Sequence, residues 1–128
     1  MSRNPLTLSA AVIALGAAMA PNLALAAGDL AAGKEKFTMF CVTCHGETGK
    51  GDGPGGAGLQ PPPRDFSKGD FKFDADKNGK AGEDADLKAV ITKGAYEFGG
   101  SPLMTPWGGA IPDADIDNLI AVIRSLKK

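Results

Sequence analysis

The chain carries the stretch Cys41-Val42-Thr43-Cys44-His45, which contains both of its cysteines and its one histidine. The pattern C-x-x-C-H is the signature of covalent haem attachment. Residues three and four positions apart lie on one face of a helical turn, so both thiols can reach the two vinyl groups of one porphyrin. His45 projects from the same face toward the iron. The stretch therefore predicts one covalent haem c, linked through Cys41 and Cys44 and bound axially by His45.

Two other kinds of site compete for this cysteine pair. A thioredoxin-like redox pair needs a strand before it and a helix after it. No stretch of the chain shows the alternation of apolar and polar residues that is typical of a β-strand. A structural zinc ion needs four ligands. A carboxylate would have to be the fourth, because the chain has no further cysteine or histidine. Both alternatives fit the sequence less well than haem attachment.

The composition also points to a cofactor inside the domain. Glycine and proline make up 27 of the 128 residues, which is well above their usual share. A domain of about 100 residues with so much loop buries too little apolar surface unaided, and a flat apolar macrocycle supplies what is missing. The 14 basic and 15 acidic side chains nearly balance, which argues against a nucleic-acid-binding protein, where basic clusters dominate.

Residues 1–27 are typical of a cleaved secretory signal peptide. They hold one charged side chain, Arg3, then a mostly apolar stretch from Leu6 to Ala20, and the A-x-A signature Ala24-Leu25-Ala26. The apolar stretch of 15 residues is shorter than the ~20 that span a bilayer. We therefore expect an exported protein, placed in a bacterial periplasm, with one domain over residues 28–128 and no membrane anchor.

Met104 is the expected second axial ligand. Histidine opposite a methionine thioether is an electron-transfer arrangement of haem iron. Two of the four methionines lie in the signal peptide, and Met39 precedes the attachment motif so closely that we expect it to pack within the first helix. Pro102 and Pro106 stiffen the loop around Met104. The alternative is that Met104 is an ordinary hydrophobic residue, with the iron left open or bound by lysine or water.

Three helices are expected from capping residues and hydrophobic periodicity. They run over residues 29–40, over residues 84–93 with Gly94 as the stop, and after Pro112 with Asp113 as the N-cap. The apolar face of the last helix consists of Ile116, Leu119, Ile120, Ile123 and Leu126. Residues 46–69 contain eight glycines and are expected to form an ordered loop around the haem edge, the alternative being a flexible loop.

Taken together, these features resemble a class I cytochrome c over residues 28–127. The resemblance rests on the attachment motif with Gly33 and Phe37 before it, on the stretch Gly51-Asp52-Gly53-Pro54, and on Met104 followed by an amphipathic helix. It implies an all-α fold in which three to four short helices and long loops surround one covalently bound haem. It also implies that the first and last helices cross.

The same resemblance implies further haem-pocket residues. In this family a proline carbonyl accepts a hydrogen bond from the axial histidine, and Pro54 and Pro61 both fit that role. Trp107 is a further expected pocket residue. The chain departs from the family where Val122 replaces an aromatic residue of the last helix, and where Thr105 separates Met104 from the next proline.

A weaker metal motif lies at residues 74–79, whose sequence DADKNG matches the start of a calcium loop. Asp74, Asp76 and Asn78 would be the ligands. Position 12 of such a loop should be glutamate and is Ala85 here, and Lys77 brings a charge of the wrong sign. Glu83, Asp84 or Asp86 could supply the missing carboxylate ligand instead. The alternative is an acidic turn that leads into the second helix.

The predicted function is that of a periplasmic electron carrier, not an enzyme, with redox proteins of the membrane or periplasm as partners. One alternative is a haem-bearing electron-transfer subunit of a larger periplasmic oxidoreductase. Another is a haem protein with an open iron site that binds a small ligand. Peroxidase-like chemistry is disfavoured because His45, the one histidine, is already used.

Overall fold

The computed structural model describes residues 28–128, so the signal peptide expected at residues 1–27 lies outside the described part. Within residues 28–128 there are helices and loops but no β-strand. The α-helices are α1 (Leu30–Phe40), α2 (Val42–His45), α3 (Asp84–Lys93) and α4 (Asp113–Ser125). Short 3-10 helices lie between them: η1 (Pro54–Gly56), η2 (Phe66–Lys68) and η3 (Ala95–Phe98). The predicted all-α class is confirmed, and no helix in this part is long and apolar enough to cross a membrane.

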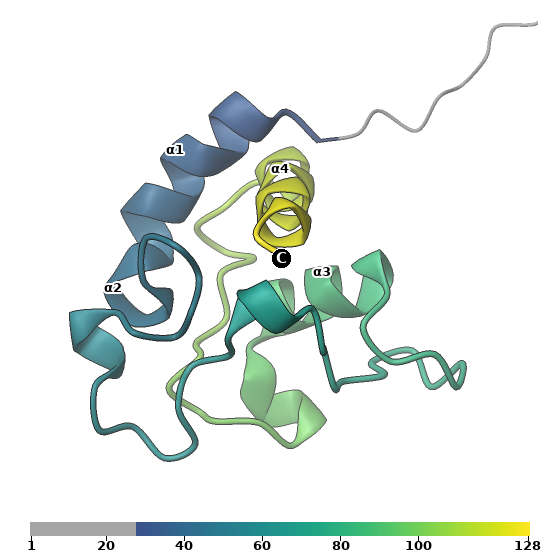
Figure 1. Ribbon diagram of the computed structural model, residues 1–128. Helices are drawn as coiled ribbons and strands as arrows, with labels where there is room; N and C mark the ends of the chain where they lie inside the picture. The colour runs from purple at the N-terminus through teal and green to yellow at the C-terminus, as the bar shows by residue number, and fades with distance from the viewer. Residues whose placement is uncertain (1–27) are drawn as a thin grey trace, which may run out of the picture.

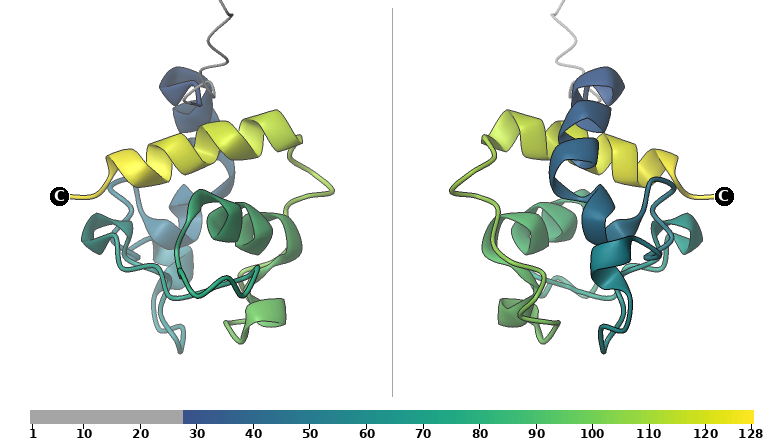
Figure 2. Two further views of the ribbon diagram at one scale, coloured as in Figure 1. Left: turned by 90° about the vertical axis from the view of Figure 1, so that its right-hand side faces the viewer. Right: turned by 90° about the vertical axis from the view of Figure 1, so that its left-hand side faces the viewer.

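The first and last helices cross at Gly33, and α4 runs across α1 in both views of Figure 2. A Cβ atom on Gly33 would collide with the backbone carbonyl oxygen of Asn118 and would lie 2.7 Å from Cγ2 of Val122. The side chain of Asn118 also accepts a hydrogen bond of 2.7 Å from the backbone N–H of Asp29. The expected crossing of α1 and α4 is therefore confirmed, with Val122 at the contact.

Replacing Gly33 with alanine will destabilise the protein although alanine favours helix. The helix propensity gained is about 1 kcal/mol, whereas forcing a methyl group into a closely packed contact costs about 3 kcal/mol. We expect a net loss of about 2 kcal/mol in urea unfolding. Gly109→Ala is the control, because a Cβ there meets nothing within 4 Å. Equal stability of the two variants would contradict the close crossing.

The core is formed mainly by α4, with α1 and α3 packed against it (Figure 1). The predicted apolar face of α4 is confirmed, with Leu126 only partly buried at the end of the helix. From the other elements, the core receives Phe37, Phe66, Leu87, Ile91 and Ile111. The prediction for Met39 is wrong, because this side chain is 59% exposed. Two residues turn a helix by about 200°, so Met39 lies on the side of α1 opposite to the buried Phe37.

The caps of the helices follow the sequence with one exception. Asp29 accepts hydrogen bonds from the backbone N–H groups of Ala31 and Ala32, as an N-cap does, and α3 has the predicted bounds with Gly94 at its end. The prediction that Asp113 caps α4 is wrong, because Pro112 occupies the N-cap position. The carbonyl of Pro112 accepts the first backbone bonds of the helix. Asp113 therefore lies in the first turn, and its carboxylate is 3.5 Å from Nζ of Lys88.

Candidate functional site

A single cavity of about 230 Å³ is lined by Cys41, Cys44, His45 and Met104. One buried water needs only ~10–15 Å³, so the cavity has room for a much larger group. Most of its other lining residues are apolar, and they come from α1, α3, α4 and the segments between the helices. The larger apolar side chains are Phe40, Leu59, Phe66, Phe71, Phe73, Leu87, Val90, Ile91, Leu103, Trp107, Ile111, Leu119 and Ile123. The donor set and the apolar walls fit a covalently attached haem.

The attachment motif occupies a helical turn that follows α1 directly. The backbone N–H of Cys41 bonds to the carbonyl of Phe37, and that of His45 bonds to the carbonyl of Cys41, both at 2.9 Å. Gly46, with φ of 80°, then ends the turn. The helical turn that the spacing of the motif predicted is therefore confirmed. No disulfide joins Cys41 to Cys44.

The competing sites for the cysteine pair find no support in the described part of the chain. Among residues 28–128, one group of three or more metal-binding side chains has its ligand atoms within 4.8 Å of one another, and it contains neither cysteine nor His45. A zinc site would require such convergence. A thioredoxin-like pair would require a strand, which residues 28–128 lack. In the chain without haem, burial and then the charge of Cys44 raise the pKa of the Cys41 thiol to about 11.

The glycine-rich loop folds back onto the attachment turn. Gly51 and Gly53 donate backbone hydrogen bonds to the carbonyls of His45 (2.8 Å) and Cys44 (3.1 Å). A Cβ on Gly53 would lie only 2.5 Å from the carbonyl oxygen of Val42, so no larger residue fits without moving the turn. The loop therefore approaches the attachment turn closely at Gly53 and fixes the turn that bears His45. Its predicted place around the haem edge stays a prediction.

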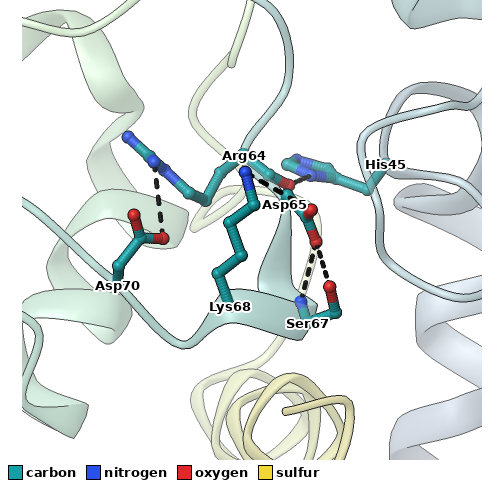
Figure 3. A network of polar contacts seen from close by, with 6 residues as sticks. All are labelled: His45, Arg64, Asp65, Ser67, Lys68 and Asp70. Carbon is teal, nitrogen blue, oxygen red and sulfur yellow. Dashed lines mark hydrogen bonds and ion pairs between the residues drawn. The ribbon is translucent and has the colours of Figure 1, made fainter. Parts of the chain in front are cut away.

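His45 is held by the backbone carbonyl of Arg64, which lies 3.1 Å from its Nδ1 (Figure 3). Burial lowers the pKa of His45, and the Arg64 hydrogen bond opposes this only partly. The imidazole is therefore neutral at neutral pH. With Nδ1–H donating to Arg64, the lone pair of Nε2 is free to bind a metal.

The expectation that Pro54 or Pro61 accepts this hydrogen bond is wrong. Pro54 begins η1 and is not among the residues that line the cavity, whereas Pro61 does line it. The three consecutive prolines that begin at Pro61 line the cavity together with the next residue, Arg64, and it is the Arg64 carbonyl that contacts the ring. Trp107 lines the cavity as predicted.

Residues around Arg64 fix the position of its carbonyl. Asp65 caps η2 by accepting hydrogen bonds from the backbone N–H of Ser67 (2.9 Å) and from its hydroxyl (2.6 Å). The guanidinium of Arg64 lies 3.6 Å from the carboxylate of Asp70 (Figure 3). Sequence reasoning missed Arg64, although the capping pattern Asp65-Phe66-Ser67 marks the turn that follows it.

Met104 lies on a loop bonded to the end of α3. Ala95, which follows α3, donates a backbone hydrogen bond of 3.0 Å to the carbonyl of Met104. Trp107 and Gly108 donate to the carbonyls of Ile91 (2.9 Å) and Thr92 (3.1 Å). These carbonyls are free of partners inside the helix because they belong to its last turn. The loop therefore has a fixed backbone, and the partly buried Met104 packs against the core.

The side chains predicted to bind calcium form hydrogen bonds within the protein. Carboxylate oxygens of Asp74, Asp76 and Asp86 lie within 4.8 Å of one another. Asn78 instead directs its side-chain N–H groups at Asp76 (3.1 Å) and Glu83 (2.7 Å). Backbone N–H groups already bond to Asp74 and Asp86. The calcium site stays a prediction, and it is tested by whether a chelator lowers the melting temperature.

Asp86, on α3, is 1% exposed and connects this helix to the acidic loop of residues 74–79. It accepts backbone hydrogen bonds from Ala75 (2.7 Å) and Glu83 (2.9 Å). Burial acts to raise the pKa of Asp86, but these bonds together with those from Asp76 and Gly82 outweigh it and leave the pKa below its ordinary value. The folded state therefore favours the carboxylate.

We expect Asp86→Asn to cost about 2 kcal/mol at pH 7, because it loses hydrogen bonds to a charged group. A carboxyl with a lowered pKa stabilises the fold above its unfolded pKa of about 3.9. That contribution is lost as the pH falls through the lower folded value. Urea unfolding should therefore separate the variant from the wild type more at pH 7 than at pH 3. Glu47→Gln, at an exposed position, is the control, and a difference independent of pH would contradict the assignment.

Comparison with known proteins places the chain in a family. The family model for cytochrome c matches residues 30–127. Cytochrome c-554(547) of Halothiobacillus neapolitanus is 34% identical over 103 residues, which cover 79% of this chain and 100% of that protein.

Two solved structures are similar as well. A chain of the Kuenenia stuttgartiensis reducing HAO-like protein complex matches with a TM-score of 0.61 and 30% identity, over 75% of this chain and 41% of that one. The present chain thus spans less than half of its length. The KustC0563 c-type cytochrome matches with a TM-score of 0.51 and 27% identity, over 75% of this chain and 98% of that one. From its motif, its fold and these relatives, the chain belongs to the cytochrome c family, as a class I c-type cytochrome that binds haem c covalently and transfers electrons.

Proposed function

We propose that the protein is a periplasmic carrier that passes one electron at a time through a single haem c with His45 and Met104 as axial ligands. The observation that carries this proposal is that both cysteines, His45 and Met104 line one apolar cavity. When bound, the haem supplies an iron centre that gains or loses one electron.

The residues of the attachment turn have separate roles in this proposal. Cys41 and Cys44 would hold the haem through two thioether links. His45 would bind the iron through Nε2, while its Nδ1–H donates to the carbonyl of Arg64.

The rigidity of the ligand-bearing segments supports a carrier. The backbone N–H of Gly51 donates a hydrogen bond to the carbonyl of His45, and that of Ala95 donates one to the carbonyl of Met104. Little of the protein would then have to move when the charge of the iron changes, and His45 and Met104 would stay in place. A carrier needs this property, whereas an enzyme needs a position on the iron that a substrate can occupy.

The charges around the cavity also disfavour an enzyme that works by acid–base chemistry. The charged side chains that line the cavity are Arg64, Lys72 and Asp86. The carboxylate of Asp86 already accepts backbone hydrogen bonds and is stable as the anion. The chain also has no second histidine, the side chain that most often exchanges protons in catalysis.

A second candidate function is that of an electron-transfer subunit within a larger oxidoreductase. The similarity to a chain of the Kuenenia stuttgartiensis reducing HAO-like protein complex favours it. In either case the partners are other redox proteins. The signal-peptide pattern of residues 1–27 supports export to the periplasm.

The test is the spectrum of the purified protein in both oxidation states. We expect low-spin iron with a weak near-infrared sulfur-to-iron band when oxidised, and no uptake of carbon monoxide when reduced. High-spin iron that binds carbon monoxide or cyanide at once would favour the open-site alternative. Elution at the mass of the monomer would favour the free carrier over the subunit.

A further inference from the structure

Phe66 lies flat against the ring of His45. The two ring centroids are 4.4 Å apart and the ring planes differ by 18°, which is a stacked arrangement. Arg64, two residues earlier, contacts the edge of the same imidazole through its carbonyl. One short segment therefore contacts His45 at an edge atom and across a face.

Phe66 is itself held firmly. Its side chain is 7% exposed, and it packs edge-on against Phe37 at 6.3 Å and tilted against Phe71 at 6.0 Å. Its backbone N–H donates a hydrogen bond of 2.6 Å to the carbonyl of Gly49. A ring fixed on this many sides forms a rigid wall for the imidazole.

The hydrogen bond and the stacked ring restrict different motions of His45. The Arg64 carbonyl fixes the tautomer and the position of Nδ1, but a single bond at one edge atom leaves the ring free to swing about that contact. A flat ring stacked on one face removes this freedom. Together they fix the rotation of the imidazole plane.

We propose that Phe66 is a positioning residue that sets the orientation of the His45 imidazole plane, and through it the electronic axes of the haem iron. The inference rests on the proposed role of His45 as an axial ligand. The iron d orbitals overlap with the π system of the imidazole, so the direction of the ring plane decides which of them is raised. Groups that orient a metal ligand tune the metal in this way.

The test compares Phe66→Leu with Phe37→Leu in the haem-loaded protein. Both variants remove a buried aromatic ring from the same cluster, but only Phe66 contacts His45 among the aromatic pairs of the described residues. We expect Phe66→Leu to change the g-values of the oxidised iron and the order of the haem-methyl signals in the NMR spectrum. Phe37→Leu should lower the melting temperature and leave both signatures as in the wild type.

Two further variants keep the test decisive if Phe66→Leu does not fold. Phe66→Met keeps an apolar side chain without a flat ring and should shift the g-values, whereas Phe66→Tyr keeps the stacked ring and should restore them. Wild-type g-values in both Phe66→Leu and Phe66→Met would overturn the proposal, and so would equal shifts in Phe37→Leu. If the wild type itself lacks low-spin, histidine-bound iron, the proposed function fails first, and that result is distinguishable.

Discussion

Replacing both Cys41 and Cys44 with serine will give a protein that carries no covalent haem and has lost much of its helix content. A serine hydroxyl does not add to a vinyl group as a thiol does, so nothing tethers the porphyrin. The cavity of about 230 Å³ among the core residues would then be left to water or would collapse. A small domain rich in glycine and proline has little other core to offset this loss.

Mass spectrometry under denaturing conditions and far-UV circular dichroism measure the two effects. The double variant should have the mass of the bare polypeptide and a weaker helical signal than the wild type. Thr43→Ala is the matched control, because Thr43 lies between the cysteines with its side chain exposed. A double variant that keeps a covalent porphyrin, or the full helical signal, would contradict this role of the cysteines.

Replacing Met104 with alanine will open the iron and lower the reduction potential. A methionine thioether opposite histidine raises the potential of haem iron, and an alanine offers no ligand. We expect a fall on the order of a quarter of the roughly 0.8 V over which axial ligands set haem potentials. The near-infrared sulfur-to-iron band should vanish, and the reduced variant should bind carbon monoxide. Spectroelectrochemistry records the potential and the band in one experiment.

Met39→Ala is the matched control for this variant. Met39 is 59% exposed on the outer side of α1, so its loss should change neither the band nor the potential. If Met104→Ala keeps both the band and the potential, Met104 is an ordinary hydrophobic residue of the cavity wall. The ligand would then have to be sought elsewhere, and Lys72 also lines the cavity.

The positions of α3 and α4 were predictable because apolar spacing and helix-ending residues are local features of the sequence. α3 has the bounds expected from its apolar spacing and from Gly94, and α4 buries the apolar face expected of it. The attachment turn α2 spans four residues, too few for any periodicity, and only the C-x-x-C-H motif indicated it. The family resemblance implied that α1 and α4 cross, but the structure alone places Gly33 at the crossing, against Asn118.

The parts that could not be predicted depend on contacts between distant segments. The acceptor for His45 is a backbone carbonyl, and a carbonyl has no signature in the sequence. Its identity as Arg64 depends on how the chain turns at η2 after three prolines. Asp86 joins Asp74 and Asp76 only because the acidic loop folds back onto α3. In the same way, the stacking of Phe66 on His45 joins residues 21 positions apart.

The most direct measurement is the intact mass of the exported protein after denaturation, together with alkylation of its free thiols. The account predicts the polypeptide mass without the signal peptide plus one haem, and no reaction at Cys41 or Cys44. A mass without porphyrin, two hydrogens below that of the reduced chain because the two sulfurs are joined to each other, would contradict it.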